Sequence, residues 1–271
     1  MSSSVSTSSE TVMSKFTTPQ GIRVSYRKSG SGPPLVLVHG GFSDHLTNWE
    51  FVEPILGTRF TLYAMARRNR GGTEATRGHA LLDEAHDVVA LMQHVGEPVF
   101  LLGHSYGAQC ALSAARLAPE CVRKLVLYEP PRPGAIAIDT FAALERLAAR
   151  GDWDGFAFTF FRDTIGVPAQ KLEALRASEL WPPIVMDAPA SLGDMRALRA
   201  HPYHAGPYRA LPMPVCLQVG SESRRDLYVT DALAAELPHA YLTVLQGQAH
   251  EGMTTAPDQY AAAVTAFLLG N

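Results

Sequence analysis

The chain has 271 residues, which is enough for one large domain with a substantial core and an inserted subdomain. Hydrophobic residues make up 46% and charged residues 18%, a balance typical of a globular protein. The formal net charge of −3 at pH 7 supplies no basic surface for nucleic acid or an anionic membrane, so neither is an expected partner. No apolar run is long enough to span a bilayer.

The cysteines and the first residues bear on the compartment. Cys110, Cys121 and Cys216 lack metal-ligand spacing and lie in or beside apolar stretches, which predicts free thiols and a reducing compartment. Residues 1–15 are rich in Ser and Thr, with neither a basic start nor an apolar run. They predict a disordered tail and no secretion signal. We therefore expect a cytoplasmic protein.

Short apolar segments alternate with amphipathic ones from residue 16 onward. Residues 34–41 begin with a continuous apolar run, as in a strand buried on both faces of a parallel sheet. In residues 79–96 the apolar side chains recur at helical spacing, and Gly96 ends the pattern. The alternation predicts βαβ units and a mainly parallel sheet covered on both faces. Strands are predicted at 21–30, 34–41, 59–66, 98–105, 122–131, 214–221 and 240–250, and helices at 79–96, 108–119 and 257–270.

One interval, residues 132–207, interrupts this alternation with helical segments only. It is too long for a bare loop, so the sequence predicts a helical insertion, here called the cap, between the core segments 16–131 and 208–271. The cap is rich in Phe and Trp. Most of these side chains are expected to form its own core, and a few, among them Trp181, to line an apolar pocket above the sheet.

The motif Gly103-His104-Ser105-Tyr106-Gly107 follows an apolar strand and precedes a helix. Gly-x-Ser-x-Gly in that setting is typical of a nucleophile elbow, a sharp turn that exposes the serine hydroxyl above the strand ends. Glycine is needed on both sides because the turn is crowded. The alternative is a plain strand-to-helix turn. The sequence favours Ser105 as a nucleophile, with His104 as a packing residue.

Several segments together resemble the α/β-hydrolase superfamily over residues 20–270. They are LVLVHGG at 35–41, ARRNRGGT at 66–73, GHSYG at 103–107, LVLYEPP at 125–131 and GQAHEG at 247–252. The resemblance implies an α/β-hydrolase fold with a helical cap and a serine hydrolase that works without a cofactor. The sequence contains no evident metal-binding cluster or phosphate loop, so we expect no metal or cofactor.

The resemblance also implies roles for particular residues. The backbone N–H groups of Gly41 and Tyr106 would form the oxyanion hole, and Phe42 beside it would contact substrate. A plain glycine turn is the alternative for this loop. His250 follows the last strand, where the superfamily's chain order of serine, acid and histidine puts the general base.

The sequence leaves the triad acid open. The usual position after the seventh strand is Ser223, which cannot hold an imidazolium by charge. A minority branch of the superfamily has the acid after the sixth strand, where this chain has Glu129 followed by two prolines. Glu129 is favoured if the sixth strand lies beside the strand that ends at Ser105. Glu222 and Asp226 are the alternatives.

One loop departs from the superfamily pattern. Relatives often have Asp-x-x-Gly after the fourth strand, where this chain has Ala66 and Asn69. Because Asn tolerates left-handed backbone angles, we expect the turn to survive without the carboxylate.

The acid after strand six, the apolar cap and the Ser/Thr-rich tail make the chain similar to bacterial and fungal lactonases such as the zearalenone hydrolases. The expected reaction is hydrolysis of an ester or lactone of an uncharged, fairly hydrophobic small molecule through an acyl-enzyme. The same triad serves carbon–carbon bond hydrolases and cofactor-free haloperoxidases, and a ligand receptor with little or no turnover is a further alternative. Haloalkane dehalogenases and epoxide hydrolases are disfavoured, because they carry aspartate at the position of Ser105.

Overall fold

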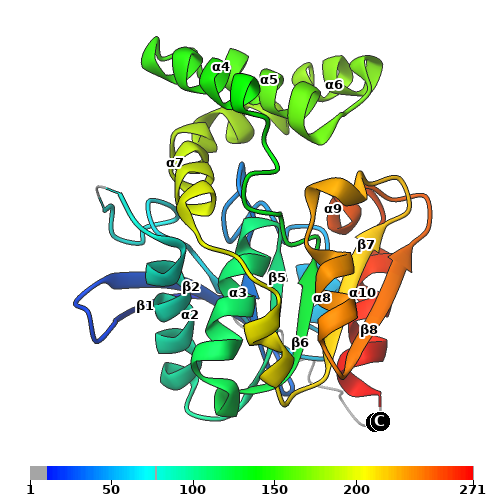
Figure 1. Ribbon diagram of the computed structural model, residues 1–271. Helices are drawn as coiled ribbons and strands as arrows, with labels where there is room; N and C mark the ends of the chain where they lie inside the picture. Colours follow the sequence, from blue (N-terminus) through cyan, green and yellow to red (C-terminus); the bar gives the residue numbers. More distant parts are fainter. Residues whose placement is uncertain (1–10, 77, 271) are drawn as a thin grey trace, which may run out of the picture.

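A single twisted sheet forms the centre of the molecule in the computed structural model, which describes residues 11–76 and 78–270 (Figure 1). The strand order within the described residues is β1-β2-β4-β3-β5-β6-β7-β8. β1 and β2 pair antiparallel at one edge, and the other six strands run parallel. The bounds are β1 Val12–Thr17, β2 Arg23–Gly30, β3 Pro34–Val38, β4 Thr61–Met65, β5 Val99–His104, β6 Val122–Tyr128, β7 Val215–Gly220 and β8 Ala240–Leu245.

Helices cover both faces of the sheet. Every residue of β3, β5 and β7 is buried, as expected for parallel strands whose continuous apolar runs pack on two sides. One hydrophobic cluster packs the sheet against α2 Leu81–Val95, α3 Tyr106–Leu117 and α8 Thr230–Glu236. A second packs the opposite face against the short α1 Glu53–Leu56 and the C-terminal α10 Pro257–Leu269. The predicted α/β-hydrolase fold class is confirmed by this architecture.

The cap lies above the carboxyl ends of the parallel strands, where Figure 1 shows it in green to yellow. Its residues contain helices and no strand in the described part of the chain. It has a hydrophobic cluster of its own, which includes Leu144, Phe156 and Trp181. Its helices are α4 Ile138–Ala149, α5 Trp153–Phe160, a π-helical turn Phe161–Ile165, α6 Ala169–Arg176 and α7 Trp181–Ala200.

The predicted tail is wrong in part. Residues 1–10 lie outside the described residues, but Val12–Thr17 forms β1 and pairs along its whole length with β2. Composition missed this strand because β1 gains its place through backbone pairing at the sheet edge, and only two of its side chains are partly buried.

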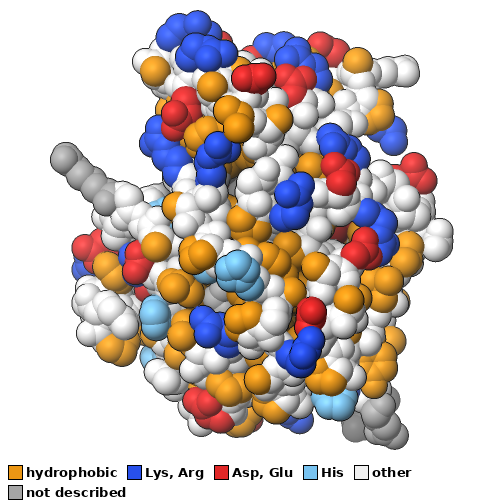
Figure 2. Space-filling model, in the orientation of Figure 1, with side chains coloured by type: hydrophobic (Ala, Val, Ile, Leu, Met, Phe, Trp, Pro, Cys, Tyr) orange, Lys and Arg blue, Asp and Glu red, His pale blue; other side chains and the backbone are white. Residues whose placement is uncertain are grey.

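Three further observations concern surface and cysteines. All three cysteines are free thiols, as predicted. Figure 2 shows acidic and basic side chains interspersed on one face, with no large area of one sign. None of the helices within residues 11–76 and 78–270 is long and apolar enough to cross a membrane.

Candidate active site

Ser105 occupies a strained turn between β5 and α3. Its backbone angles are φ 53° and ψ −127°, which a non-glycine residue rarely adopts. The flanking glycines are required by contact: a Cβ on Gly103 would lie 2.6 Å from the Ala108 backbone, and one on Gly107 would lie 2.3 Å from the Val38 carbonyl oxygen. The Ser105 amide donates to the Tyr128 carbonyl at the end of β6, which fixes the turn against its neighbouring strand.

The loop after β3 passes directly over this turn. A Cβ on Gly40 would lie 3.0 Å from the Ser105 Cβ, so any larger residue would require the turn to shift. Gly41, Phe42 and Tyr106 all line the same pocket as Ser105. The Phe42 amide donates to the Ser191 hydroxyl of α7 at 2.6 Å, and Phe42 itself has φ 55°. Tyr106 begins α3, so its backbone N–H belongs to the first helical turn, which has no acceptor inside the helix.

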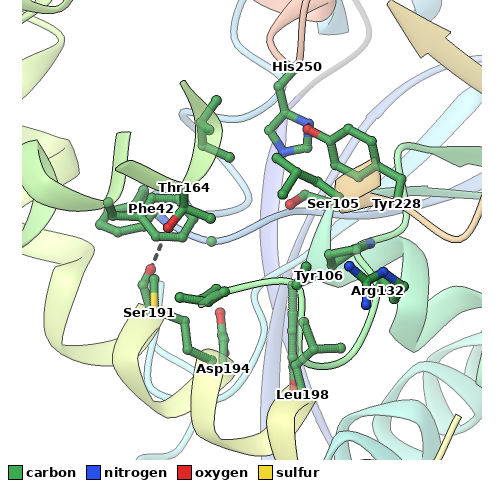
Figure 3. A pocket seen from close by; sticks show the side chains of 18 of the residues that line it. Phe42, Ser105, Tyr106, Arg132, Thr164, Ser191, Asp194, Leu198, Tyr228 and His250 are labelled. Carbon is green, nitrogen blue, oxygen red and sulfur yellow. Dashed lines mark hydrogen bonds between the residues drawn. The ribbon is translucent and has the colours of Figure 1, made fainter. Parts of the chain in front are cut away.

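Glu129 and His250 form a buried pair beside Ser105. The His250 Nδ1 lies 2.5 Å from the Glu129 Oε2, and the other carboxylate oxygen accepts the Gly220 amide at 2.8 Å. Glu129 is fully buried, with a positive φ of 49° directly after β6. β6 pairs in parallel with β5, so the two strands that end at Ser105 and Glu129 are neighbours. Figure 3 shows the His250 ring directed toward Ser105.

Glu129 and His250 shift each other's pKa. Burial alone would raise the pKa of Glu129, but the hydrogen bond and charge of His250 outweigh it, and the pKa lies below its usual value. Burial alone would lower the pKa of His250, and the hydrogen bond and charge of Glu129 raise it above 6.5. A histidine with a raised pKa is a stronger base in its neutral form.

The two alternative acids lie elsewhere. The Asp226 side chain is exposed and pairs with Arg224 at 2.8 Å. Glu222 is exposed on the turn after β7. Of the three carboxylates weighed from the sequence, Glu129 is the one that contacts His250.

Sequence reasoning missed Tyr228, which packs on the His250 ring. The two rings stack with centroids 5.3 Å apart and an interplanar angle of 12°, and the Tyr228 hydroxyl lies 3.1 Å from the His250 Nδ1. An isolated bridge between Pro131 and Tyr228 holds it next to the Glu129 turn. The segment after β7 carries no motif that predicts this contact.

His104 is a packing residue, as its position in the elbow predicts. Its Nδ1 lies 3.0 Å from the Asn48 side-chain oxygen, and its Nε2 lies 3.0 Å from the His250 carbonyl oxygen. The ring is buried beneath the His250 loop, and each of its nitrogens faces a protein oxygen. Burial holds the pKa of His104 well below its usual value, so the neutral ring has one N–H and donates to one of the two oxygens.

The pocket above Ser105 encloses about 90 Å³ between the sheet and the cap. Its lining is mostly apolar and aromatic. Trp181 is not part of it: its side chain is buried in the cap's own cluster, and its Nε1 donates to Asp154 at 2.7 Å. The expectation that Trp181 lines the pocket is therefore wrong, because aromatic content does not reveal which side of a helix faces the sheet. The cap side chains in the lining include Ile136, Phe141, Phe160, Phe161, Ile165 and Met195.

A buried ionic cluster joins α7 of the cap to the core on the other side of the pocket. Arg67 is fully buried and pairs with Glu84 of α2 at 3.1 Å and Asp194 of α7 at 2.6 Å. Arg70 pairs with the same Asp194 at 2.8 Å and with Asp187 at 2.7 Å. Both arginines come from the loop after β4 that departs from the superfamily pattern.

The turn in that loop survives without the aspartate. Asn69 has φ 64°, the left-handed conformation expected of it, and its side-chain oxygen accepts the Thr76 amide at 2.8 Å. The turn allows Arg67 and Arg70, on its two sides, to reach the same carboxylate.

Two groups of side chains in the described residues have the spacing of metal ligands. In the group of His79, Glu84 and Asp194, both carboxylates are already paired with arginines. The arginines neutralise the negative charge that would otherwise attract a cation. In the group of His104, His250 and Glu251, the His104 nitrogens are engaged as described above. Neither set offers the free donors of a metal centre.

Comparison with known proteins identifies the family. Residues 35–263 match the model of the Alpha/beta hydrolase family, and the chain belongs to that family. It is 31% identical to the pimeloyl-[acyl-carrier protein] methyl ester esterase of Methylococcus capsulatus over 221 residues. This alignment covers 76% of this chain and 83% of the esterase. The crystal structure of an alpha/beta hydrolase from Sphaerobacter thermophilus superposes with a TM-score of 0.81 at 25% identity and covers 94% of this chain and all of that one.

Other curated relatives match in part only. Uncharacterized proteins of Mycobacterium tuberculosis and Mycobacterium bovis are 32% identical over 117 residues, which is 42% of this chain. The match spans a third of the length of those relatives. The comparisons support a hydrolase, and they leave the substrate to be argued from the site.

Proposed function

We propose that the protein is a serine hydrolase that cleaves a carboxylic ester or lactone through an acyl-enzyme, with Ser105, His250 and Glu129 as the catalytic triad. The observation that carries the proposal is the buried Glu129–His250 pair beside a serine in a strained glycine-flanked turn. Strained backbone at Phe42 and Ser105, which line the pocket, and at Glu129 behind His250 fits a site whose geometry is held ready before substrate binds.

Each group of the triad has one role in the proposed mechanism. The neutral His250 Nε2 takes the Ser105 proton as the hydroxyl oxygen attacks the carbonyl carbon, and the Nδ1–H donates to Glu129, which stabilises the imidazolium. The backbone N–H groups of Gly41 and Tyr106 would hold the developing oxyanion. The imidazolium then protonates the leaving alcohol, and water activated by His250 releases the acid from the acyl-enzyme.

The neighbouring contacts support Gly41 as the oxyanion donor in this loop. The adjacent Phe42 N–H already donates to Ser191, which removes it from competition. Gly41 carries no side chain that could shield its own N–H from a substrate in the pocket.

The substrate class follows from the lining. Aromatic and aliphatic side chains predominate, which favours a fairly hydrophobic molecule that is uncharged where it contacts the cap. The enclosed volume favours a small acyl or alcohol group. Arg132 and Arg199 also lie in the lining, so esters with and without a free carboxylate belong in any substrate panel.

An ester and lactone panel with Ser105→Ala as control tests the proposal. Hydrolysis should fall by about 10³-fold or more in the variant, because the nucleophile is lost while alanine still fits the turn. Circular dichroism and the unfolding midpoint should match the wild type. Near-normal hydrolysis by Ser105→Ala would refute the assignment.

Covalent labelling separates the nucleophile from its base. A fluorophosphonate should modify Ser105, identified by mass spectrometry of the labelled peptide, and His250→Ala should slow the reaction greatly. Rapid labelling of His250→Ala would mean that another group activates the serine. Labelling without turnover of any ester would favour a ligand receptor over an enzyme.

A further inference from the structure

One hydroxyl of the cap, Ser191 on α7, reaches the loop above the nucleophile. It is almost fully buried yet belongs to the pocket lining. Its oxygen accepts the Phe42 amide at 2.6 Å, and its own proton is donated to the Asp187 carboxylate at 2.8 Å. The Arg70 guanidinium donates to the same oxygen at 3.2 Å. Figure 3 shows Ser191 linked to the Phe42 backbone across the pocket wall.

These contacts use the whole hydrogen-bonding capacity of the hydroxyl. A serine side chain has one donor proton and two acceptor lone pairs. Asp187 takes the proton, and Phe42 and Arg70 use the lone pairs, so the oxygen has one orientation. The hydroxyl therefore holds the Phe42 amide in a fixed place.

The loop is confined between Ser191 and Ser105. On the lower side, a Cβ on Gly40 would lie 3.0 Å from the Ser105 Cβ. On the upper side, a Cβ on Gly41 would lie 3.3 Å from the Ser191 oxygen. The next residue, Phe42, has left-handed angles that a phenylalanine does not favour and that its surroundings must impose.

We propose that Ser191 is a positioning residue of the active site: by fixing the strained Phe42 peptide, it aims the preceding Gly41 N–H at the oxyanion. The inference rests on the proposed function, because it assigns a partner to the oxyanion hole of that reaction. The cap would thereby contribute to rate as well as to substrate choice, since a cap residue sets the geometry of a core loop.

The ionic cluster allows the positioning role of Ser191 to be tested separately from the attachment of the cap to the core. α7 is held to the core by Arg67 and Arg70 through Asp194 and Asp187, which remain when the Ser191 hydroxyl is removed. The variant Ser191→Ala should therefore keep the cap in place. What it loses is the acceptor for one strained peptide.

The kinetic test compares Ser191→Ala with Ser178→Ala. Ser178 is also a cap serine, but it lies outside the pocket lining, and its hydroxyl donates to the Leu175 carbonyl at 2.7 Å within the cap. Ser191→Ala should lower kcat by about 10- to 100-fold, less than outright loss of an oxyanion donor, with KM within about threefold. Inhibition by phenylboronic acid, whose tetrahedral adduct carries a hydroxyl in the oxyanion hole, should weaken by a similar factor. Ser178→Ala should change neither quantity more than about twofold.

Amide hydrogen exchange tests the same link without turnover. Peptides covering residues 40–44 should exchange faster in Ser191→Ala, because the Phe42 amide loses its acceptor, and at the wild-type rate in Ser178→Ala. If the wild type hydrolyses no ester, the proposed function fails while the exchange arm still reports on the loop. Unchanged kcat and boronate affinity in an active enzyme, or unchanged exchange in Ser191→Ala, would overturn the inference. A loss that appears in KM alone would assign Ser191 to substrate binding instead.

Discussion

Two buried ionic sites flank the pocket, and they differ in what their protons can do. The Glu129–His250 pair combines a carboxylate with a base that gains or loses a proton near neutral pH. The cluster of Arg67, Arg70 and Asp194 combines carboxylate with guanidinium, which stays protonated at any pH the protein meets. The first site can therefore exchange protons with a substrate, whereas the second can only hold elements together.

The partners of each site agree with this division. One nitrogen of His250 faces Glu129, and its ring is directed toward Ser105 in the open pocket. Asp194 faces two arginines and is buried away from solvent. The attraction of Arg67 and Arg70 overcomes the effect of burial and holds the pKa of Asp194 well below its usual range. Burial is common to both sites, so the difference lies in the chemistry of the partner.

The largest expected effect on stability comes from removing the Asp194 carboxylate, which Arg67 and Arg70 share. Asp194→Asn leaves two buried guanidinium groups with one fewer counter-charge, and breaking a buried pair in this way costs about 3–5 kcal/mol of unfolding free energy. The loss is measured by urea denaturation followed by circular dichroism. Activity of the folded fraction should fall far less than in a triad variant.

Arg196→Gln is the matched control for that experiment. Arg196 also lies on α7 and pairs with Glu145, but both side chains are exposed, so the pair contributes about 1 kcal/mol or less. If Asp194→Asn were no less stable than Arg196→Gln, the cluster would not be what attaches the cap.

The corresponding change at the Glu129–His250 pair is Glu129→Gln. The amide keeps the size of the side chain but cannot stabilise the imidazolium by charge, so kcat should fall by about 10²-fold or more. Steady-state kinetics on one ester near neutral pH gives the value. The unfolding midpoint should move much less than in Asp194→Asn.

Two further amide variants sharpen this result. Glu222→Gln and Asp226→Asn remove the carboxylates that the sequence left as alternatives, and both lie on the exposed side of the turn after β7. Each should retain wild-type kcat within about twofold. A crippled Asp226→Asn together with a normal Glu129→Gln would return the acid to the seventh strand.

The Ser105 turn and the Glu129–His250 pair were accessible from the sequence because their signals are local. Gly-x-Ser-x-Gly between a strand and a helix, and His250 between the last strand and the last helix, are patterns within a few residues. Glu129 required one inference about topology, that the sixth strand lies beside the fifth, and the parallel pairing of β5 with β6 bears this out.

The rest depends on contacts that no local pattern encodes. Arg70 meets Asp194 across 124 residues of sequence, and Phe42 meets Ser191 across 149. A run of arginines after a strand ordinarily predicts a solvated loop, and burial of Arg67 follows only once α7 supplies its carboxylate. Trp181 shows the same limit for apolar residues, since a cap helix has one side toward its own core and another toward the pocket.

The two sites should also respond to pH in different observables. Since Glu129 raises the pKa of His250, kcat/KM should fall on the acidic side through a pKa above 6.5, and this limb should move to lower pH in Glu129→Gln. Beside the cluster, His79 lies 3.3 Å from Glu84 and 3.7 Å from Asp194; burial lowers its pKa, but these two carboxylates raise it to about 9. A raised folded-state pKa gives stability that is present below pH 6.5 and is lost as the pH rises through 9.

Unfolding measured between pH 7 and 9 checks the second half of this prediction. The wild type should lose stability across that window, and His79→Gln should lose less. An activity profile that shifts in His79→Gln as it does in Glu129→Gln would mean that the two sites are coupled and that the cluster also affects catalysis.

The smallest expected effect concerns the apolar lining of the pocket. Phe141 of α4 lines the pocket and is partly exposed there, whereas Trp181 is buried in the cap's own cluster. Phe141→Ala should raise KM for a long-chain ester about five- to tenfold, because roughly 1–1.4 kcal/mol of apolar contact with the substrate is lost. Its KM for 4-nitrophenyl acetate, which has no long chain for Phe141 to contact, should stay within twofold. Trp181→Ala should instead lower the unfolding midpoint and leave the ratio of the two KM values unchanged, since its indole contacts other cap residues and Asp154. If Trp181→Ala altered that ratio while Phe141→Ala did not, the side of the cap that faces substrate would be the opposite one, and the pocket would extend between the cap helices instead of above the sheet.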